Sequence, residues 1–92
     1  MHKVIRRFGF PLYDGLHELM IPEDYEVLAV YSDQYGMAMD VITDETAGHR
    51  PAYFYTAAAN VPLPMWCRWS THIGFSCGRH VFEHGQVKPE SQ

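Results

Sequence analysis

PLYDGLHELMIPEDYEVLAVYSDQYGMAMDVITD, residues 11–44, is the stretch that decides the fold class. Residues 19–22 form a short apolar run that a proline stops, and residues 25–31 carry β-branched and aromatic side chains on both faces. After a connection that ends at Gly36, apolar and small or polar residues alternate through residues 37–42. The pattern predicts consecutive short antiparallel strands, and it indicates that residues 25–31 form a central strand, covered on both faces, where the core lies.

The flanking segments extend the same pattern. Residues 2–10 predict an edge strand that ends before Pro11, and the turn residues that follow favour a hairpin between this strand and the next. Residues 43–51 are polar and predict the longest surface loop, and strand character resumes at residues 52–56.

The C-terminal third is expected to hold the only helix and the last two strands. At most one short helix fits between residues 56 and 69, because two prolines follow a short alanine run. Residues 71–77 and 79–84 predict a closing hairpin around Gly78.

Length and composition fit one small globular domain. Ninety-two residues are too few for two ordinary domains, and 47% hydrophobic with 20% charged residues excludes a disordered chain. We expect a mainly β fold, with a β-rich α+β fold as the alternative: a single domain over residues 1–85, built as an antiparallel sheet of short strands. Residues 86–92 are expected to form a polar C-terminal tail.

The charge balance argues against binding nucleic acid by bulk attraction. The formal net charge is −4, whereas a protein that relies on phosphate contacts usually carries a basic excess. Basic residues nevertheless cluster at Lys3, Arg6 and Arg7, and acidic residues dominate the middle of the chain. This uneven distribution suits either a solvated surface or a partner that presents both protein and nucleic acid.

No apolar run approaches the roughly 18 to 20 residues that span a bilayer, and no apolar segment follows the N-terminal arginines. We therefore expect no membrane contact and a cytosolic protein. Cys67 and Cys77 are expected to be reduced thiols, mostly buried, because a small secreted scaffold usually has more cysteines.

The residues with chemical potential do not form a recognisable catalytic or metal motif. Cys67, His72, Cys77, His80 and His84 are ligand types for zinc, but no Cys-x2-Cys pair is present and strand alternation predicts that His72 and His80 have different neighbours. We expect no metal, no cofactor, no small-molecule substrate and no catalytic residue.

Trp66, Arg68 and Trp69 form the most concentrated aromatic and cationic group. In a domain this small such side chains fill the core, and on a surface they become hot spots for partners. The sequence leaves both roles open and favours burial.

The order of three segments resembles a family of small phage-encoded β-rich proteins of unknown function. The segments are KVIRRFGFPLYDG, HELMIPEDYEVLAV and THIGFSCGRHVFEH, which together cover most of the chain. The matching positions are turn and core residues, namely Phe10-Pro11, Asp14-Gly15, Ile21-Pro22 and His80-Val81-Phe82-Glu83. This resemblance implies a fold and not an activity.

The whole chain also resembles the phage anti-CRISPR proteins that inhibit the type I-F surveillance complex, a crRNA-guided ribonucleoprotein. That resemblance implies a stoichiometric inhibitor, working in the cytoplasm of the infected bacterial host, that binds Cas protein subunits, with or without crRNA, so that target DNA cannot hybridise. The alternative is a phage structural or accessory protein, or a modulator of another host protein. The charged residues expected to touch the partner are Lys3, Arg6, Arg7, Arg50, Arg68, Arg79, Asp44 and Glu45.

Overall fold

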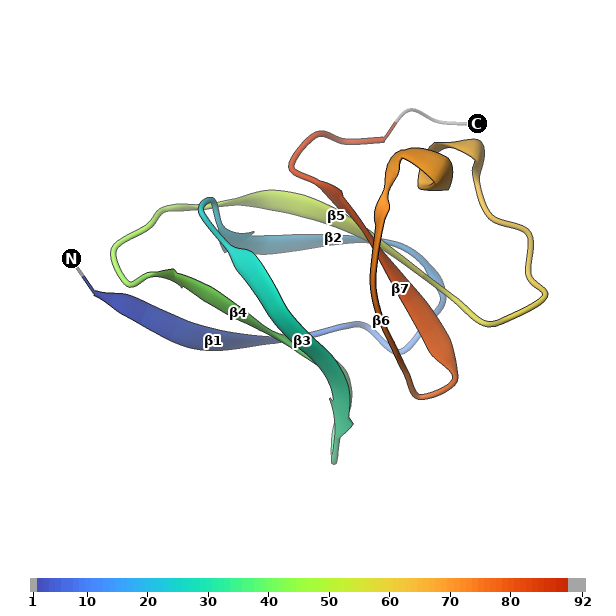
Figure 1. Ribbon diagram of the computed structural model, residues 1–92, viewed down its shortest axis with the longest axis horizontal. Coiled ribbons are helices and arrows are strands. Elements are labelled where there is room, and N and C mark those ends of the chain that lie inside the picture. Colours follow the sequence, from blue (N-terminus) through green and yellow to red (C-terminus); the bar gives the residue numbers. More distant parts are fainter. Residues whose placement is uncertain (1, 90–92) are drawn as a thin grey trace.

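The computed structural model describes residues 2–89, which form seven strands and one 3-10 helix arranged in two antiparallel sheets (Figure 1). The strand order is β1-β4-β3 in the first sheet and β2-β5-β7-β6 in the second. The mainly β prediction is confirmed, and so is the single short helix. The elements are β1 (Lys3–Gly9), β2 (Gly15–Pro22), β3 (Glu26–Asp33), β4 (Gly36–Asp44), β5 (His49–Ala57), η1 (Met65–Trp69), β6 (Thr71–Ser76) and β7 (Arg79–Gly85).

The core lies between the inner faces of the two sheets. Directly paired residues of antiparallel strands share a face, and the register places Val41 of β4 opposite Arg6 of β1 and Val27 of β3. The buried cluster draws on both sheets and on the connection between β1 and β2; it comprises Phe10, Ile21, Met37, Met39, Val41, Ala52, Phe54 and Val81. The alternate residues Met37, Met39 and Val41 of β4 therefore face the core, as the sequence predicted.

The two sheets come closest where β3 meets β6. A Cβ atom added to Gly74 would lie 2.6 Å from the Cβ of Val30, far inside ordinary contact distance. A glycine is therefore required at this position of β6 for the sheets to approach as they do.

The closing hairpin between β6 and β7 is confirmed, and its turn follows from the backbone conformation. Cys77 and Gly78 both have positive φ values, 55° and 75°. Two such residues between paired strands are typical of a type I′ turn, whose twist matches that of a hairpin. Glycine adopts this conformation without strain, whereas Cys77 does so at some cost.

Three expectations, two about strand arrangement and one about a loop, are wrong. β1 and β2 do not form a hairpin: they lie in different sheets, because buried Phe10 carries the chain from one layer to the other. β3 is an edge strand, and β4 is the centre of the three-stranded sheet. The polar loop is shorter than predicted, since β4 runs to Asp44 and β5 begins at His49.

Residues 86–89 lie against the domain. Within the polar tail expected for residues 86–92, Gln86 is half-buried and Pro89 is buried, whereas Val87 and Lys88 are exposed. The last three residues of that tail lie outside the described part of the chain.

Candidate functional site

The basic residues expected to bind a partner do not gather into one patch. Lys3 and Arg7 lie on the outer face of β1, where the register places them opposite Asp44 and Asp40. Arg6 lies on the other face of this edge strand and remains exposed. The group that is continuous in sequence is therefore divided between two faces.

Arg7 is neutralised within its own sheet. Its Nε lies 3.4 Å from Asp40 Oδ1, and its Nη1 lies 4.0 Å from Asp33 Oδ2. Its guanidinium carbon is 5.3 Å from the centre of the Tyr31 ring, and the Tyr31 hydroxyl donates a hydrogen bond of 2.7 Å to Asp40. Tyr31 and then Asp40 raise the pKa of Arg7 further above its ordinary value. A phosphate would have to compete with these contacts.

The other predicted arginines lie on different elements. Arg79, at the start of β7, pairs with Asp14, and Arg68 lies on η1 with its guanidinium carbon 5.9 Å from the ring centre of Trp69. Arg50 is exposed in β5. Within residues 2–89, no ion pair involves Arg6, Arg50 or Arg68. These three cations therefore keep their charge available to a partner.

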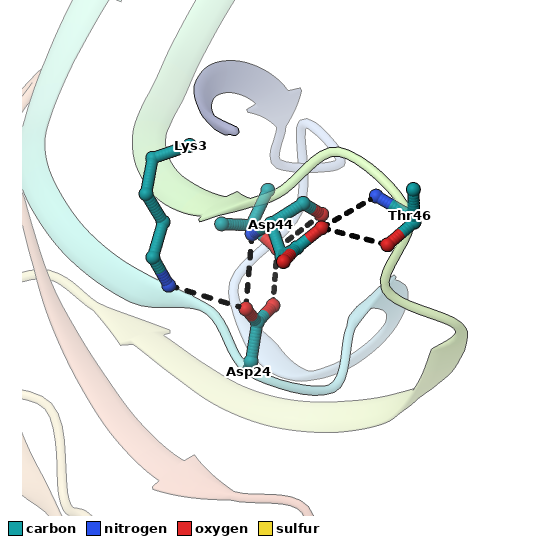
Figure 2. Close-up of polar contacts among 5 residues, drawn as sticks. Lys3, Asp24, Asp44 and Thr46 are labelled. Atoms are coloured by element: carbon teal, nitrogen blue, oxygen red, sulfur yellow. Dashed lines mark hydrogen bonds and ion pairs between the residues drawn. The ribbon is translucent and has the colours of Figure 1, made fainter. Parts of the chain in front are cut away.

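Figure 2 shows the polar network that we call the turn cluster, made of Lys3, Asp24, Thr43, Asp44 and Thr46. Asp24 accepts hydrogen bonds from the Thr43 hydroxyl and, at 2.9 Å, from the Asp44 amide, and Lys3 Nζ lies 3.5 Å from it. The Thr43 bond is the largest of the effects that lower the pKa of Asp24. The cluster ties the turn after β2 to the end of β4 and the start of β1.

Asp44 belongs to the turn cluster, whereas its neighbour Glu45 does not. Asp44 is buried, and its Oδ1 accepts bonds from the amide (2.9 Å) and the hydroxyl (2.7 Å) of Thr46. It thus shapes the turn before β5 and is not free to contact a partner. Glu45 is exposed, and its amide donates to the carbonyl of His2 at 3.0 Å.

A second exposed surface surrounds η1. Five large apolar side chains here are 44% to 77% exposed; we call them the η1 surface, and they are Val61, Leu63, Met65, Trp69 and Val87. An open groove of about 510 Å³ runs beside Met65 and Trp69 and is completed by residues 87–89. Exposed apolar groups gathered in this way are typical of a binding surface.

Trp66 anchors the η1 surface to the second sheet. Its ring meets Tyr55 edge-on at 5.5 Å and His84 at 5.0 Å between centroids, and it is 9% exposed. Trp69 is 77% exposed. The burial that the sequence favoured for this aromatic group therefore holds for one tryptophan and not for the other.

The histidines and cysteines also differ from the expectations. His72 and His80 are direct neighbours, with 2.9 Å between His72 Nε2 and His80 Nδ1, because a shift of register in β6 brings them together diagonally. Cys67 is buried and Cys77 is exposed, so the prediction of two buried thiols is wrong for Cys77. Both are free, and residues 2–89 contain no group of three or more His, Cys, Asp or Glu side chains placed to hold one metal ion.

None of the helical structure in residues 2–89 is long and apolar enough to cross a membrane. Comparisons of the chain with protein-family models, curated proteins and solved structures found no match. No relative therefore indicates what these surfaces bind.

Proposed function

We propose that the protein is a non-catalytic phage inhibitor that binds the type I-F surveillance complex and keeps target DNA from pairing with the crRNA. The class of partner comes from the sequence resemblance, and the proposed place of action is the cytoplasm of the infected bacterium. The observation that carries a binding role is the η1 surface, with Trp69 at its most exposed point. Binding by occupancy requires a rigid surface and no catalytic pocket.

Trp69 has the chemistry of an interface hot spot. A tryptophan side chain buries about 150 to 250 Å². Covering the 77% of Trp69 that is exposed contributes roughly 3 to 5 kcal/mol at about 25 cal/mol per Å², before the costs of association. One side chain of this kind can therefore dominate an interface of ordinary size.

The charges beside the η1 surface indicate which part of the complex it meets. Arg68 and Lys88 lie among or next to its apolar groups, and among residues 2–89 no carboxylate lines the groove beside Trp69. This surface suits an apolar protein segment flanked by Asp or Glu. We therefore assign it to a Cas protein subunit.

Contact with nucleic acid is assigned to other residues. Arg6 and Arg50 are exposed and take part in no ion pair within residues 2–89, so they can approach a crRNA phosphate without losing a partner. Lys3, Arg7 and Arg79 would first have to leave an acid. Exposed Glu45 suits a lysine or arginine of the complex.

The test is co-elution of the purified protein with an assembled type I-F surveillance complex, followed by a target-DNA binding assay. We expect a stable complex that no longer binds DNA. Trp69→Ala should weaken the association by about 30-fold or more, the ratio that corresponds to a hot spot of about 2 kcal/mol. Tyr35→Ala is the matched control, since Tyr35 is 80% exposed and lies in the turn between β3 and β4.

Two other outcomes would change the proposal. Equal weakening by Trp69→Ala and Tyr35→Ala would move the interface away from η1. No co-elution at micromolar concentration would refute the surveillance complex as the partner and favour the alternative, a structural or accessory phage protein. Arg6→Glu isolates the crRNA contact, because it reverses a charge without breaking an ion pair among the described residues.

A further inference from the structure

Two histidines meet on the outer face of the second sheet, beside the loop that leads from β5 into η1. His72 of β6 pairs in register with Phe82, and His80 of β7 pairs with Phe75, so the two imidazoles are diagonal neighbours. His72 Nε2 lies 2.9 Å from His80 Nδ1, and the ring centres are 5.1 Å apart. Both nitrogens of this pair therefore converge on the same small volume.

The rings on either side limit how the two imidazoles can move. The Phe75 ring lies 4.6 Å from His80, and the Phe82 ring lies 5.3 Å from His72, measured between centroids. Both pairs are packed on a sheet, whose strands fix the positions of the Cβ atoms. The histidines are thus held together by neighbours that carry no charge.

The separation of the two nitrogens matches a cis pair of metal ligands. Imidazole nitrogens bind zinc at about 2.0 to 2.1 Å, and two such bonds that end 2.9 Å apart enclose an angle of about 90°. Copper and nickel also take imidazole ligands, and square-planar or tetragonal sites require neighbouring ligands at about this angle.

We propose that His72 and His80 form a two-ligand chelate for a divalent transition metal, with Cu²⁺ bound most tightly. The affinity order follows the general series in which Cu²⁺ exceeds Ni²⁺ and Zn²⁺. Water fills the remaining positions, which agrees with the lack of a third protein ligand within residues 2–89.

When both imidazole rings are neutral, metal binding requires a change of tautomer, and neither ring has to release a proton. One of the two facing nitrogens now donates a hydrogen bond to the other. In the chelate both facing nitrogens present a lone pair, so His72 keeps its proton on Nδ1 and His80 keeps its proton on Nε2. Acid weakens the site, because protonated imidazole cannot coordinate a metal.

The chelate would link an edge strand to its neighbour. β6 lies at the end of the four-stranded sheet and has only β7 as a paired strand. A ligand that binds the folded protein and not the unfolded chain raises the apparent stability. Cu²⁺ should therefore raise the melting temperature of the protein, and this effect does not depend on the proposed partner.

The test is calorimetric titration of the full, untagged protein with Cu²⁺ alone, repeated with Ni²⁺ and Zn²⁺. We expect a site that binds one Cu²⁺ and loses at least tenfold in affinity in both His72→Ala and His80→Ala. The matched controls are His49→Ala and His2→Ala, since both residues are exposed, His49 at the start of β5 and His2 just before β1. Melting curves without metal identify any variant that is unfolded.

The controls separate the chelate from copper binding at the exposed histidines His2 and His49. The His2 control matters because His2 is an exposed imidazole outside the second sheet. Loss of binding only in His2→Ala, or equal affinity in wild type and His72→Ala, would overturn the proposal. Loss in His80→Ala alone would also overturn it, since it would indicate a single imidazole ligand. The melting temperature of wild type should rise with Cu²⁺, and that of His72→Ala should not.

Discussion

Replacing Gly74 with alanine tests the way in which the two sheets pack. The added Cβ would lie 2.6 Å from Val30 Cβ, 3.0 Å from Val30 Cγ2 and 3.3 Å from Val30 Cγ1. Carbon atoms in good contact are about 3.5 to 4.0 Å apart, so β6 and β3 would have to separate by about 1 Å. Overpacking of this kind typically costs about 1 to 3 kcal/mol.

Urea denaturation and thermal melting measure this cost. A loss of about 2 kcal/mol lowers the melting temperature of a domain of this size by roughly 8 to 16 °C. Gly9→Ala is the control, because a Cβ atom at Gly9 meets nothing within 4 Å. That variant should change the free energy of unfolding by no more than about 0.5 kcal/mol.

A second substitution attributes the loss to the Val30 contact. Val30→Gly removes all three atoms that the new methyl group would strike. Gly74→Ala combined with Val30→Gly should therefore lose less stability than the sum of the single changes, by an amount within the usual coupling range of about 0.5 to 3 kcal/mol. If Gly74→Ala is as stable as Gly9→Ala, or if the two losses simply add, the close approach of β3 and β6 is not as described.

Three further predictions concern titration and thiol reactivity. Burial lowers the pKa of His17 below 6.5, so the unfolded chain binds more protons than the folded protein in mild acid. The free energy of unfolding should therefore fall as the pH drops through 6.5. In His17→Phe, urea titrations at pH 7.5 and 5.5 should no longer show this decrease. The pKa of Asp24 is held below 3.8, so its contribution is present above that pH and is lost in stronger acid; melting curves of Asp24→Asn should depend less on pH between about 5 and 2.5. Ellman's reagent should modify exposed Cys77 in the native protein and reach Cys67, whose pKa burial raises, only on unfolding; equal rates for the two thiols would contradict the fold.

The strands could be predicted from the sequence because the signal for each one is local. Alternation and turn residues indicated every strand from β1 to β7 within a few residues. The pairing of strands is not local. β1 pairs with β4 and β2 with β5, and the buried Phe10 that separates the two layers resembles any other apolar residue beside a proline.

The candidate site was less predictable for the same reason. Lys3 and Arg7 look available in the sequence, but their partners Asp24 and Asp40 lie 21 and 33 positions away. Asp44 looks like a loop carboxylate, but it is buried and its Oδ1 accepts two hydrogen bonds from Thr46. Trp66 and Trp69 belong to one short helix, and only the packing of the chain distinguishes the buried ring from the exposed one.

The basic group of β1 also has a structural explanation, since β1 is an edge strand. An edge strand presents unpaired backbone groups, and charged side chains keep such an edge from pairing with another chain. Arg6 and Arg7 lie in the middle of β1, and each points to a different face of it, so the strand carries charge on both sides. Substituting them together would therefore promote aggregation as well as alter binding. The η1 surface has no such structural duty at Trp69, which makes that residue the more decisive probe of function.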